Sequence, residues 1–477
     1  MNPTDIILSR FEQVSSIPRG TKHEEKIRSW LIAWAEELGF RSSVDAVGNL
    51  VMYIPASSGM ETSPVLILQG HMDMVWQKTP DCTHDFLRDP IRLIRDGDWI
   101  KADRTTLGAD NGIAIALMMA LVEDETVKHP PLVLVLTVEE EFGLAGADYL
   151  DANLLTGKTL INLDSEGEGV FTVGCAGGGS VIMDFPVQLE NISAAEKSFR
   201  LNVSGLLGGH SGEDIAKHRA NANKLLVRAL DELQKELPIR LVSFKGGTAR
   251  NAIPRDAEAV LVCSQEQADL VRKITPAFES VLRAEFAQTE SGLILVLTEA
   301  DAQQGAMSIM DSRRFIKLLI SLPNGVSDFS AEVEGFVETS NNIGIIEMAE
   351  TGIRVVSNHR SSVRSRMEEI ARRVEAVAEL ANVKHERTKM FPPWQANTDS
   401  VVLKKCEEVY KQCFGVVPKV ELSHGGLECG IISDRCGGLD TISLGPTIEN
   451  PHSPDERLYV PSLQKTWKFL VALLRVL

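Results

Sequence analysis

Residues 65–75 read VLILQGHMDMV. The first five residues could fill a buried strand, and a glycine then leads into His71 and Asp73, which lie two positions apart. Side chains at positions i and i+2 of a strand point to the same side of it. We therefore expect an imidazole and a carboxylate to face one common site at the end of a core strand.

The chain around this stretch alternates between helical and extended patterns up to about residue 175. Helices are expected at about 3–16, at 23–38 and over 108–124, where GADNGIAIALMMALVED is typical of a buried helix. Continuously apolar strands separated by helices indicate a sheet covered on both faces, so the expected fold class is α/β. The expected strands are Leu50–Ile54, Val65–Leu68, Leu132–Leu136 and Leu160–Leu163.

The pattern changes between about residues 180 and 390. Phe199–Val203 alternates strictly between apolar and polar residues, Ile353–Asn358 mixes them, and each is followed by a helical pattern. Such strands favour half-exposed sheets with helices on one face. The two strand-then-helix units could form two α+β subdomains.

Beyond about residue 391 the first pattern returns. A helix is expected at 400–414, a short apolar strand at 441–444 and a final helix at 462–477. The simplest organisation is one α/β domain, made of residues 1–178 and 391–477, interrupted by an inserted α+β domain at 179–390.

The composition limits the classes of function. The chain has 477 residues, which is too many for one ordinary core, and its formal charge of −17 argues against nucleic acid or an anionic membrane as a partner. We see no targeting segment and no run of 18 apolar residues. The seven cysteines are scattered without the spacing of a zinc knuckle, so we expect free thiols in a reducing, cytoplasmic environment.

Acidic residues follow several of the expected strands. Asp110 lies at the start of the buried helix, Glu139, Glu140 and Glu141 follow the strand 132–136, and Asp164 follows the strand 160–163. In open α/β sheets the ligand crevice lies at the carboxyl ends of the strands. We therefore expect these carboxylates to meet His71 in one cleft.

Carboxylates that converge on one cleft repel each other unless a cation compensates their charge. Imidazole together with carboxylates suits zinc, with manganese or cobalt as substitutes. His452, in the Gly/Pro-rich loop GPTIENPHSPDE after the strand 441–444, is the expected second histidine.

Other interpretations compete at single positions. Asp110 could be a helix N-cap. The three consecutive glutamates could form a solvated acidic turn. If they belong to a catalytic site, chemistry alone does not show which of them is the base. Asp164 competes with Glu166 and Glu168, and its place directly after Leu163 favours it.

The motifs HMDMV, TTLGADNG, EEEFG, NLDSEGEG and PHSPDE occur in this order. Together they resemble the co-catalytic zinc aminopeptidase and carboxypeptidase superfamily, and most closely its aminoacyl-histidine dipeptidase (Xaa-His dipeptidase, carnosinase-type) branch. SSIPRGTKHEEKI, GLLGGHSGEDI, NAIPR, SNHRSS and HGGLECGI extend the likeness over nearly the whole chain. The resemblance implies a mixed, mostly parallel sheet sandwiched by helices, with a large inserted α+β lid domain.

The resemblance also implies two Zn²⁺ per chain, with Co²⁺ or Mn²⁺ as substitutes. His71, Asp110 and Asp164 would hold one ion. Asp110, Glu141 and His452 would hold the other, with Asp110 bridging. Asp73 would hydrogen-bond His71 and fix its tautomer.

The remaining implied roles concern the reaction and the substrate. The resemblance aligns Gly143 with the glycine of the family's motif. This alignment makes Glu140 the general base and gives Glu139 no role. His210 would stabilise the oxyanion from the inserted segment. Substrate would be recognised by Asn251, Arg360 and Glu428, with the last holding the substrate amine.

The sequence therefore predicts a cytoplasmic dinuclear zinc dipeptidase that cleaves Xaa-His and other unblocked dipeptides, without nucleic acid or membrane as partner. The alternatives are a related tripeptidase, an acyl-amino-acid deacylase or carboxypeptidase of the same superfamily, or a metal-bound peptide-binding protein without catalysis. The protein would be a monomer or a homodimer. The length of the insertion favours a monomer in which His210 acts within its own chain.

Overall fold

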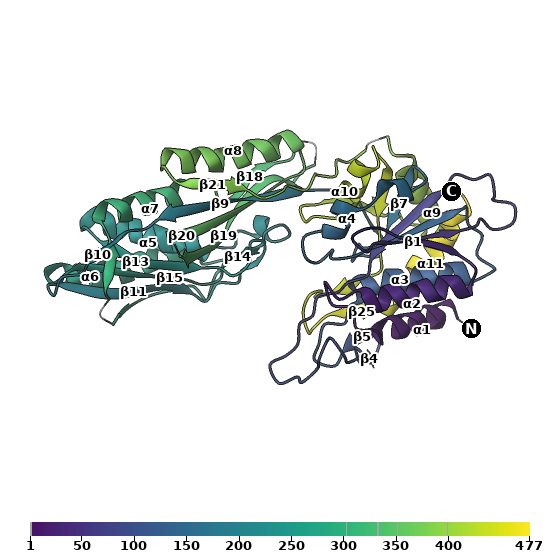
Figure 1. Ribbon diagram of the computed structural model, residues 1–477, viewed down its shortest axis with the longest axis horizontal. Coiled ribbons are helices and arrows are strands. Elements are labelled where there is room, and N and C mark those ends of the chain that lie inside the picture. Colours follow the sequence, from purple (N-terminus) through teal and green to yellow (C-terminus); the bar gives the residue numbers. More distant parts are fainter. Residues whose placement is uncertain (1, 302, 332, 351, 398) are drawn as a thin grey trace. The chain divides into compact units, whose positions relative to one another are not determined.

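The computed structural model describes residues 2–301, 303–331, 333–350, 352–397 and 399–477. The chain divides into two compact units (Figure 1). Unit 1 comprises Met1–Cys175, Trp394–Leu422 and Leu427–Leu477, and unit 2 comprises Ala176–Pro393 and Ser423–Gly426. No helix among the described residues combines the length and apolar composition that crossing a membrane requires.

Unit 1 is built on a mixed sheet of eight strands. Its four central strands, β6, β3, β7 and β23, pair in parallel, and antiparallel strands flank them. The expected mixed α/β sheet is thus confirmed. In sheet order the strands are β1 (Arg41–Val44), β2 (Leu50–Ile54), β6 (Leu132–Thr137), β3 (Leu66–His71), β7 (Thr159–Asn162), β23 (Asp440–Ser443), β8 (Val170–Cys175) and β22 (Lys419–Ser423).

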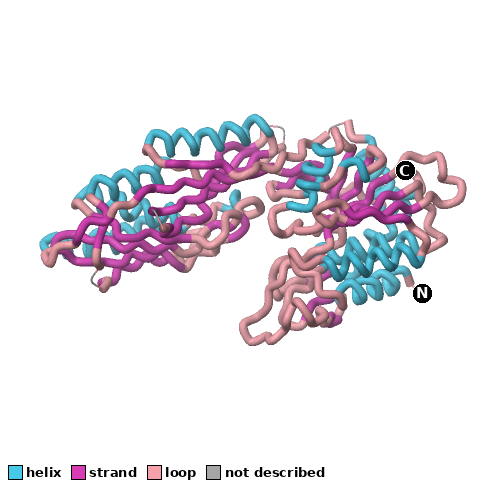
Figure 2. The backbone as a smooth tube through the Cα atoms, in the orientation of Figure 1, coloured by secondary structure: helices cyan, strands magenta, loops and turns pink. Residues whose placement is uncertain are grey.

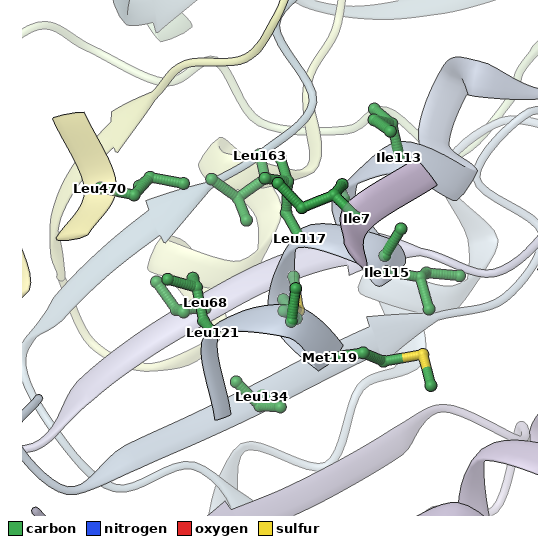
Figure 3. Close-up of a cluster of buried hydrophobic side chains, with 14 of the residues drawn as sticks. Ile7, Leu68, Ile113, Ile115, Leu117, Met119, Leu121, Leu134, Leu163 and Leu470 are labelled. Atoms are coloured by element: carbon green, nitrogen blue, oxygen red, sulfur yellow. The ribbon is translucent and has the colours of Figure 1, made fainter. Parts of the chain in front are cut away.

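Helices bury both faces of this sheet. The expected buried helix is α3 (Ala109–Glu123), and Figure 3 shows Leu117 and Leu121 of α3 in one apolar cluster with Leu68 of β3 and Leu134 of β6. The alternate strand residue Ile67 points to the opposite face and is also fully buried. The other helices of unit 1 are α1 (Pro3–Ser15), α2 (Glu25–Glu37), α4 (Ala145–Tyr149), α9 (Val401–Phe414), α10 (Glu428–Arg435) and α11 (Val460–Leu474).

A second, four-stranded sheet in unit 1 carries the loop that contains His452. This loop joins two short strands that pair antiparallel with each other. The strands in sheet order are β24 (Ile448–Glu449), β25 (Arg457–Tyr459), β5 (Trp99–Ala102) and β4 (Leu93–Asp96).

Unit 2 contains one antiparallel sheet of nine strands with a layer of helices against it (Figures 1 and 2). Burial alternates along Phe199–Val203 as the sequence predicts. The main strand path is β16 (Ile294–Glu299), β11 (Glu196–Ser204), β15 (Ala257–Ser264), β13 (Arg240–Gly246), β19 (Val337–Ala349), β20 (Gly352–Ser361), β9 (Gly177–Pro186) and β21 (Lys384–Arg387), with β18 (Gly325–Phe329) beside β19.

The helices of unit 2 pack side by side and form a core with the sheet. The helical patterns at 221–237 and 365–380 predict two helices, and the structure has both within one residue of these ends: α5 (Ala222–Glu236) and α8 (Arg364–Leu380). Between them the structure adds α6 (Ala268–Glu285) and α7 (Ile309–Ser321), for which the patterns gave no expectation.

Candidate metal centre

The five candidate metal ligands all lie in unit 1, near the carboxyl ends of its parallel strands. His71 is the last residue of β3, Glu141 follows β6, and Asp164 follows β7. Asp110 lies at the start of α3, and His452 lies in the loop between β24 and β25. Three of the side chains thus lie at or just after strand ends, and the other two lie at a helix start and in a loop.

Asp110 stands between the two histidines. Its Oδ1 lies 3.0 Å from Nε2 of His71, and its Oδ2 lies 3.0 Å from Nε2 of His452. The same nitrogen of His71 is 3.4 Å from Oδ1 of Asp164, and that of His452 is 3.0 Å from Oε2 of Glu141. The side chains therefore form two groups of three. Asp110 belongs to both groups and contributes one of its carboxylate oxygens to each.

These groups fit divalent cations. Zinc ligands at about 2.0–2.2 Å from a tetrahedral ion lie roughly 3.3–3.6 Å from one another, which is close to the separations seen here. One potential ligand atom from each of His71, Asp110 and Glu141 lies within 4.8 Å of the others. Oε1 of Glu141 is buried and has no hydrogen-bond partner among the described residues. Two imidazoles with three carboxylates suit zinc, cobalt or manganese.

The pKa values show how strongly this cluster needs positive charge. Burial, followed by the charge of Asp110, raises the pKa of Glu141 to about 7. Burial also raises the pKa of Asp164 and raises that of Glu140 well above its usual value. Burial opposes protonation of His71, yet Asp164 and Asp110 raise the pKa of this imidazole well above its usual value. Protons thus compensate the crowded carboxylates where a cation could do so.

Asp73 connects the histidine ligand to the segment of the predicted base. It is fully buried, and its Oδ1 lies 3.3 Å from Nδ1 of His71. Its two carboxylate oxygens accept the backbone N–H groups of Glu140 (3.0 Å) and Glu141 (3.2 Å). A carboxylate at Nδ1 leaves Nε2 of His71 directed at the other ligands, which is the arrangement that the predicted orienting role of Asp73 requires.

The carboxylate of Asp110 does not act as a helix cap. Asp110 and Asn111 have non-helical backbone angles and form a kink at the start of α3, so Asp110 lies at a position where a cap could stand. Its carboxylate pairs with imidazoles, whereas the carboxylate of Glu456 accepts the backbone N–H groups at 107–110.

The two competing acidic residues differ in their surroundings. Glu168 accepts hydrogen bonds from Tyr410 and Lys465. Glu166 keeps an exposed surface, yet burial, followed by the charge of the nearby Asp110, raises the pKa of its carboxyl to about 9, so it belongs to the same electrostatic cluster. Among the three acids of this loop, Asp164 pairs with His71. Glu139 has a left-handed φ of 51°, and its backbone N–H donates to the carboxylate of Glu24.

Three of the predicted substrate-contacting residues lie in unit 2. Nη2 of the buried Arg360, on β20, is 3.3 Å from Nε2 of His210, on β12 (Gly209–His210). Asn251 is exposed and directly precedes β14 (Ala252–Ile253), the strand paired with β12. His424 lies in the same unit and bonds Ser340 at 2.8 Å. The structure thus brings Arg360 and His210 together.

Glu428, the remaining predicted substrate residue, lies in unit 1 and is fully buried. Its Oε2 accepts hydrogen bonds of 2.6 Å from Gln69 and from Thr137. Its Oε1 is buried without a hydrogen-bond partner among the described residues. Burial raises the pKa of this carboxyl to about 8. A carboxylate with one free oxygen could accept a cationic group.

The sequence reasoning missed two residues that contact the backbone of the ligand segments, Arg19 and Glu456. Both lie in motifs that were singled out, SSIPRGTKHEEKI and PHSPDE, but neither motif assigns them a role. Their partners are 53 to 349 positions away in the chain, so local patterns do not identify them.

Comparison with known proteins identifies the chain's relatives. Residues 67–476 match the peptidase family M20/M25/M40. The chain is 39% identical over 465 residues to the cytosol non-specific dipeptidase of Escherichia coli (strain K12), covering 98% of this chain and 96% of that one. It is also 39% identical to the aminoacylhistidine dipeptidase of Vibrio alginolyticus, whose crystal structure superposes with a TM-score of 0.84 over 99% of this chain and 96% of that chain.

A tripeptidase structure from Staphylococcus aureus is more distant. It is 18% identical, with a TM-score of 0.57 and coverage of 99% of this chain and 98% of that chain, and it shows a shared fold. The family resemblance drawn from the sequence motifs is confirmed.

Proposed function

Because this chain belongs to the peptidase family M20/M25/M40 and is a metallopeptidase, we propose that it hydrolyses Xaa-His and other unblocked dipeptides with two zinc ions. The single observation that carries the proposal is the position of Asp110, whose two oxygens each lie 3.0 Å from a histidine nitrogen. The names of the relatives from Escherichia coli and Vibrio alginolyticus agree with a dipeptidase. The first of these names also supports a cytosolic location.

We assign the metal ligands as two groups that share one carboxylate. His71, Asp110 and Asp164 would hold one zinc ion, and Asp110, Glu141 and His452 the other, with Co²⁺ or Mn²⁺ as substitutes. When bound, such ions polarise a peptide carbonyl and make a water molecule more acidic. Asp73 keeps the imidazole of His71 in the orientation that presents Nε2.

Glu140 is assigned as the general base. Its backbone N–H is fixed by Asp73, and burial raises the pKa of its carboxyl well above the usual value. A raised pKa makes a carboxylate a better proton acceptor near neutral pH. Glu140 takes a proton from the attacking water and then gives it to the leaving amine.

Four further residues are assigned to contacts with the substrate. The forked guanidinium of Arg360 suits the C-terminal carboxylate of a dipeptide, and we assign the neighbouring His210 as the residue that stabilises the oxyanion. Asn251 offers an amide to the peptide group. In unit 1, the free Oε1 of Glu428 is an acceptor for the substrate amine.

The test is zinc-dependent hydrolysis of Ala-His, β-Ala-His, Ala-Ala and N-acetylalanine by the wild type, Glu140→Gln and Glu139→Gln. We expect turnover of Ala-His, a loss of about 100- to 10,000-fold in Glu140→Gln, and little change in the matched Glu139→Gln variant. Both variants should still bind two zinc ions.

Other outcomes point elsewhere. Cleavage of N-acetylalanine in place of the dipeptides would identify a deacylase. Two bound zinc ions without turnover of any substrate would identify a peptide-binding protein. Activity restored by mixing His210→Ala chains with Glu140→Ala chains would show that His210 acts across a dimer and would contradict the prediction that it acts within its own chain.

A further inference from the structure

Arg19 is a buried arginine that takes no part in the reaction described above. Its side chain is 2% exposed. Nη1 donates to the backbone carbonyls of Met72 (3.0 Å) and Asp73 (2.8 Å), and Nη2 donates to the carbonyl of Gly108. Met72 and Asp73 directly follow the ligand His71, and Gly108 precedes the ligand Asp110 by two residues. One guanidinium thus joins the backbones of two ligand-bearing segments.

The surrounding backbone leaves space for this guanidinium. A Cβ added at Gly112 would lie 2.4 Å from Nη2 of Arg19, and one added at Gly108 would lie 2.7 Å from the same atom. Carbon atoms do not approach a nitrogen this closely without displacing it. A side chain at either position of the α3 segment would therefore displace the guanidinium of Arg19.

Glu456 acts on the same segment from a third direction. It lies four residues after the ligand His452 and is 2% exposed. One of its oxygens accepts the backbone N–H groups of Leu107 (2.8 Å) and Gly108 (3.0 Å). The other accepts those of Ala109 (2.8 Å) and Asp110 (3.3 Å). The loop that carries His452 is thereby held to the segment that carries Asp110.

We infer that Arg19 and Glu456 are positioning residues of the metal centre, which fix the backbones bearing His71, Asp110 and His452 at the spacing that two metal ions require. This inference rests on the proposed dinuclear function. Gly108 is the residue that the two side chains share, because its N–H donates to Glu456 while its carbonyl accepts from Arg19. Displacement of either side chain shifts the bridging Asp110 against both histidines.

Charge gives Arg19 a second effect on the same site. Burial lowers the pKa of its guanidinium, and the carboxylates of Glu456, Asp73, Asp110 and Glu141 act in the opposite direction. Arginine keeps its proton in proteins, so these carboxylates have a permanent buried cation nearby. That charge offsets part of their repulsion before any metal binds.

The experiment uses the full-length protein stripped of metal and titrated with Zn²⁺ by calorimetry, and with Co²⁺ by visible absorption. Arg19→Lys keeps the charge, but its single nitrogen cannot reach both the carbonyls at 72 and 73 and the carbonyl of Gly108. Arg19→Met removes the charge and all of these hydrogen bonds. Glu456→Gln keeps the size but turns an amide N–H₂ toward backbone donors. Arg435→Lys and Glu449→Gln are the matched controls, since Arg435 bonds the carbonyls of 148 and 150 and Glu449 pairs with an exposed arginine.

We expect Glu456→Gln and Arg19→Lys to bind at least one of the two ions about 10- to 100-fold more weakly, and Arg19→Met to be the most affected. The Co²⁺ absorption bands should shift, and kcat should fall more than KM changes. The controls should match the wild type in all three measurements.

Unchanged metal affinities and Co²⁺ bands in Arg19→Lys and Glu456→Gln, with only a lower melting temperature, would reduce both residues to ordinary stabilisers of the fold and overturn the inference. If Arg19→Met does not fold, the two milder variants still decide. A wild type that fails to bind two ions would contradict the proposed function itself, which separates that failure from this one.

Discussion

Histidine occurs in opposite electrostatic surroundings in the two units. In unit 1, His71 is within 3.4 Å of three carboxylates, and its pKa is raised well above the usual value despite burial. In unit 2, burial, followed by the charge of Arg360, lowers the pKa of His424 to about 3. Both imidazoles are buried, so the sign of the neighbouring charges makes the difference.

This contrast separates two kinds of ligand. The carboxylate cluster of unit 1 is stabilised by cations, which fits metal ions. The group formed by Arg360 and His210 in unit 2 offers donors and positive charge, which fits an anion such as a peptide carboxylate. The two units thus have complementary chemistry, and each can be altered separately by mutation.

The largest expected effect comes from Asp110→Asn in unit 1. An amide of the same size removes the charge that lies between His71 and His452. Loss of a partner that only orients a ligand costs about 10- to 100-fold, so loss of the shared ligand should lower activity by more than about 1000-fold. Zinc titration should show fewer than two ions. Asp103→Asn, which removes the partner of the exposed Arg92, is the control and should keep both ions. Retention of two ions by Asp110→Asn would contradict the shared-ligand assignment.

A second prediction concerns the acid stability of unit 2. Burial, followed by the charge of Arg387, lowers the pKa of the fully buried His359 to about 4, from 6.5. Between these values the unfolded chain binds a proton that the folded unit does not, so the free energy of unfolding decreases as the pH falls from 6.5 to 4. The loss reaches about 3 kcal/mol below pH 4. His359→Gln should remove this part of the pH dependence.

Hydrogen exchange of peptides from β20 measures this effect in the correct unit. All six tryptophans and four tyrosines lie in unit 1, so their fluorescence reports on unit 1 instead. The exposed His218→Asn is the control and should leave the exchange of β20 as pH-dependent as in the wild type. The same acid response in His359→Gln and the wild type would assign the lability of unit 2 to other groups.

The sequence predicts unit 1 well because its signals are local. An apolar run such as 65–68 can be read from adjacent residues, and the ligands are found because they follow such runs. Asp164 is preferred to Glu166 by its distance from the strand end, and the structure pairs it with His71. The roles assigned to these residues remain predictions from family likeness.

Other features depend on contacts between distant segments. Arg19 looks like an ordinary charged residue in a loop, and only the folded chain shows its bonds to carbonyls 53 to 89 positions away. In unit 2, α6 contains Pro276, and a proline in a helix interior removes a backbone donor, so the local sequence argues against a continuous helix there. Asp110 satisfies the composition rule for an N-cap, but two imidazoles compete for its carboxylate with the backbone N–H groups.

A third prediction tests the anion-binding character of unit 2. Arg360→Met should lower kcat/KM for Ala-His by about 10- to 100-fold, because hydrogen bonds to charged groups contribute about 1.5–3 kcal/mol. The same variant should hydrolyse the C-terminal amide of Ala-His about as well as the wild type does, and its zinc affinity should not change. Arg354→Met is the control on the same strand, where Arg354 pairs with Asp184. Equal losses on the acid and the amide would argue against a carboxylate-binding role.

The smallest expected effect comes from Thr21→Val, which tests whether a hydrogen-bond donor from the N-terminal segment contributes to the charged cluster of unit 1. The hydroxyl of Thr21 donates to Oδ2 of Asp73 at 2.9 Å, and Asp73 keeps its bonds from the backbone at 140 and 141 when this donor is lost. Thr21→Val should therefore lower kcat by only about fivefold, the equivalent of one hydrogen bond of about 1 kcal/mol, with both zinc ions retained. Thr126→Val, which removes the hydroxyl donor of the exposed Thr126 to Asp124, should have no effect on turnover. A loss in Thr21→Val as large as that of Asp110→Asn would mean that Asp73 depends on every one of its donors, and that the cation requirement of unit 1 extends beyond its metal ligands.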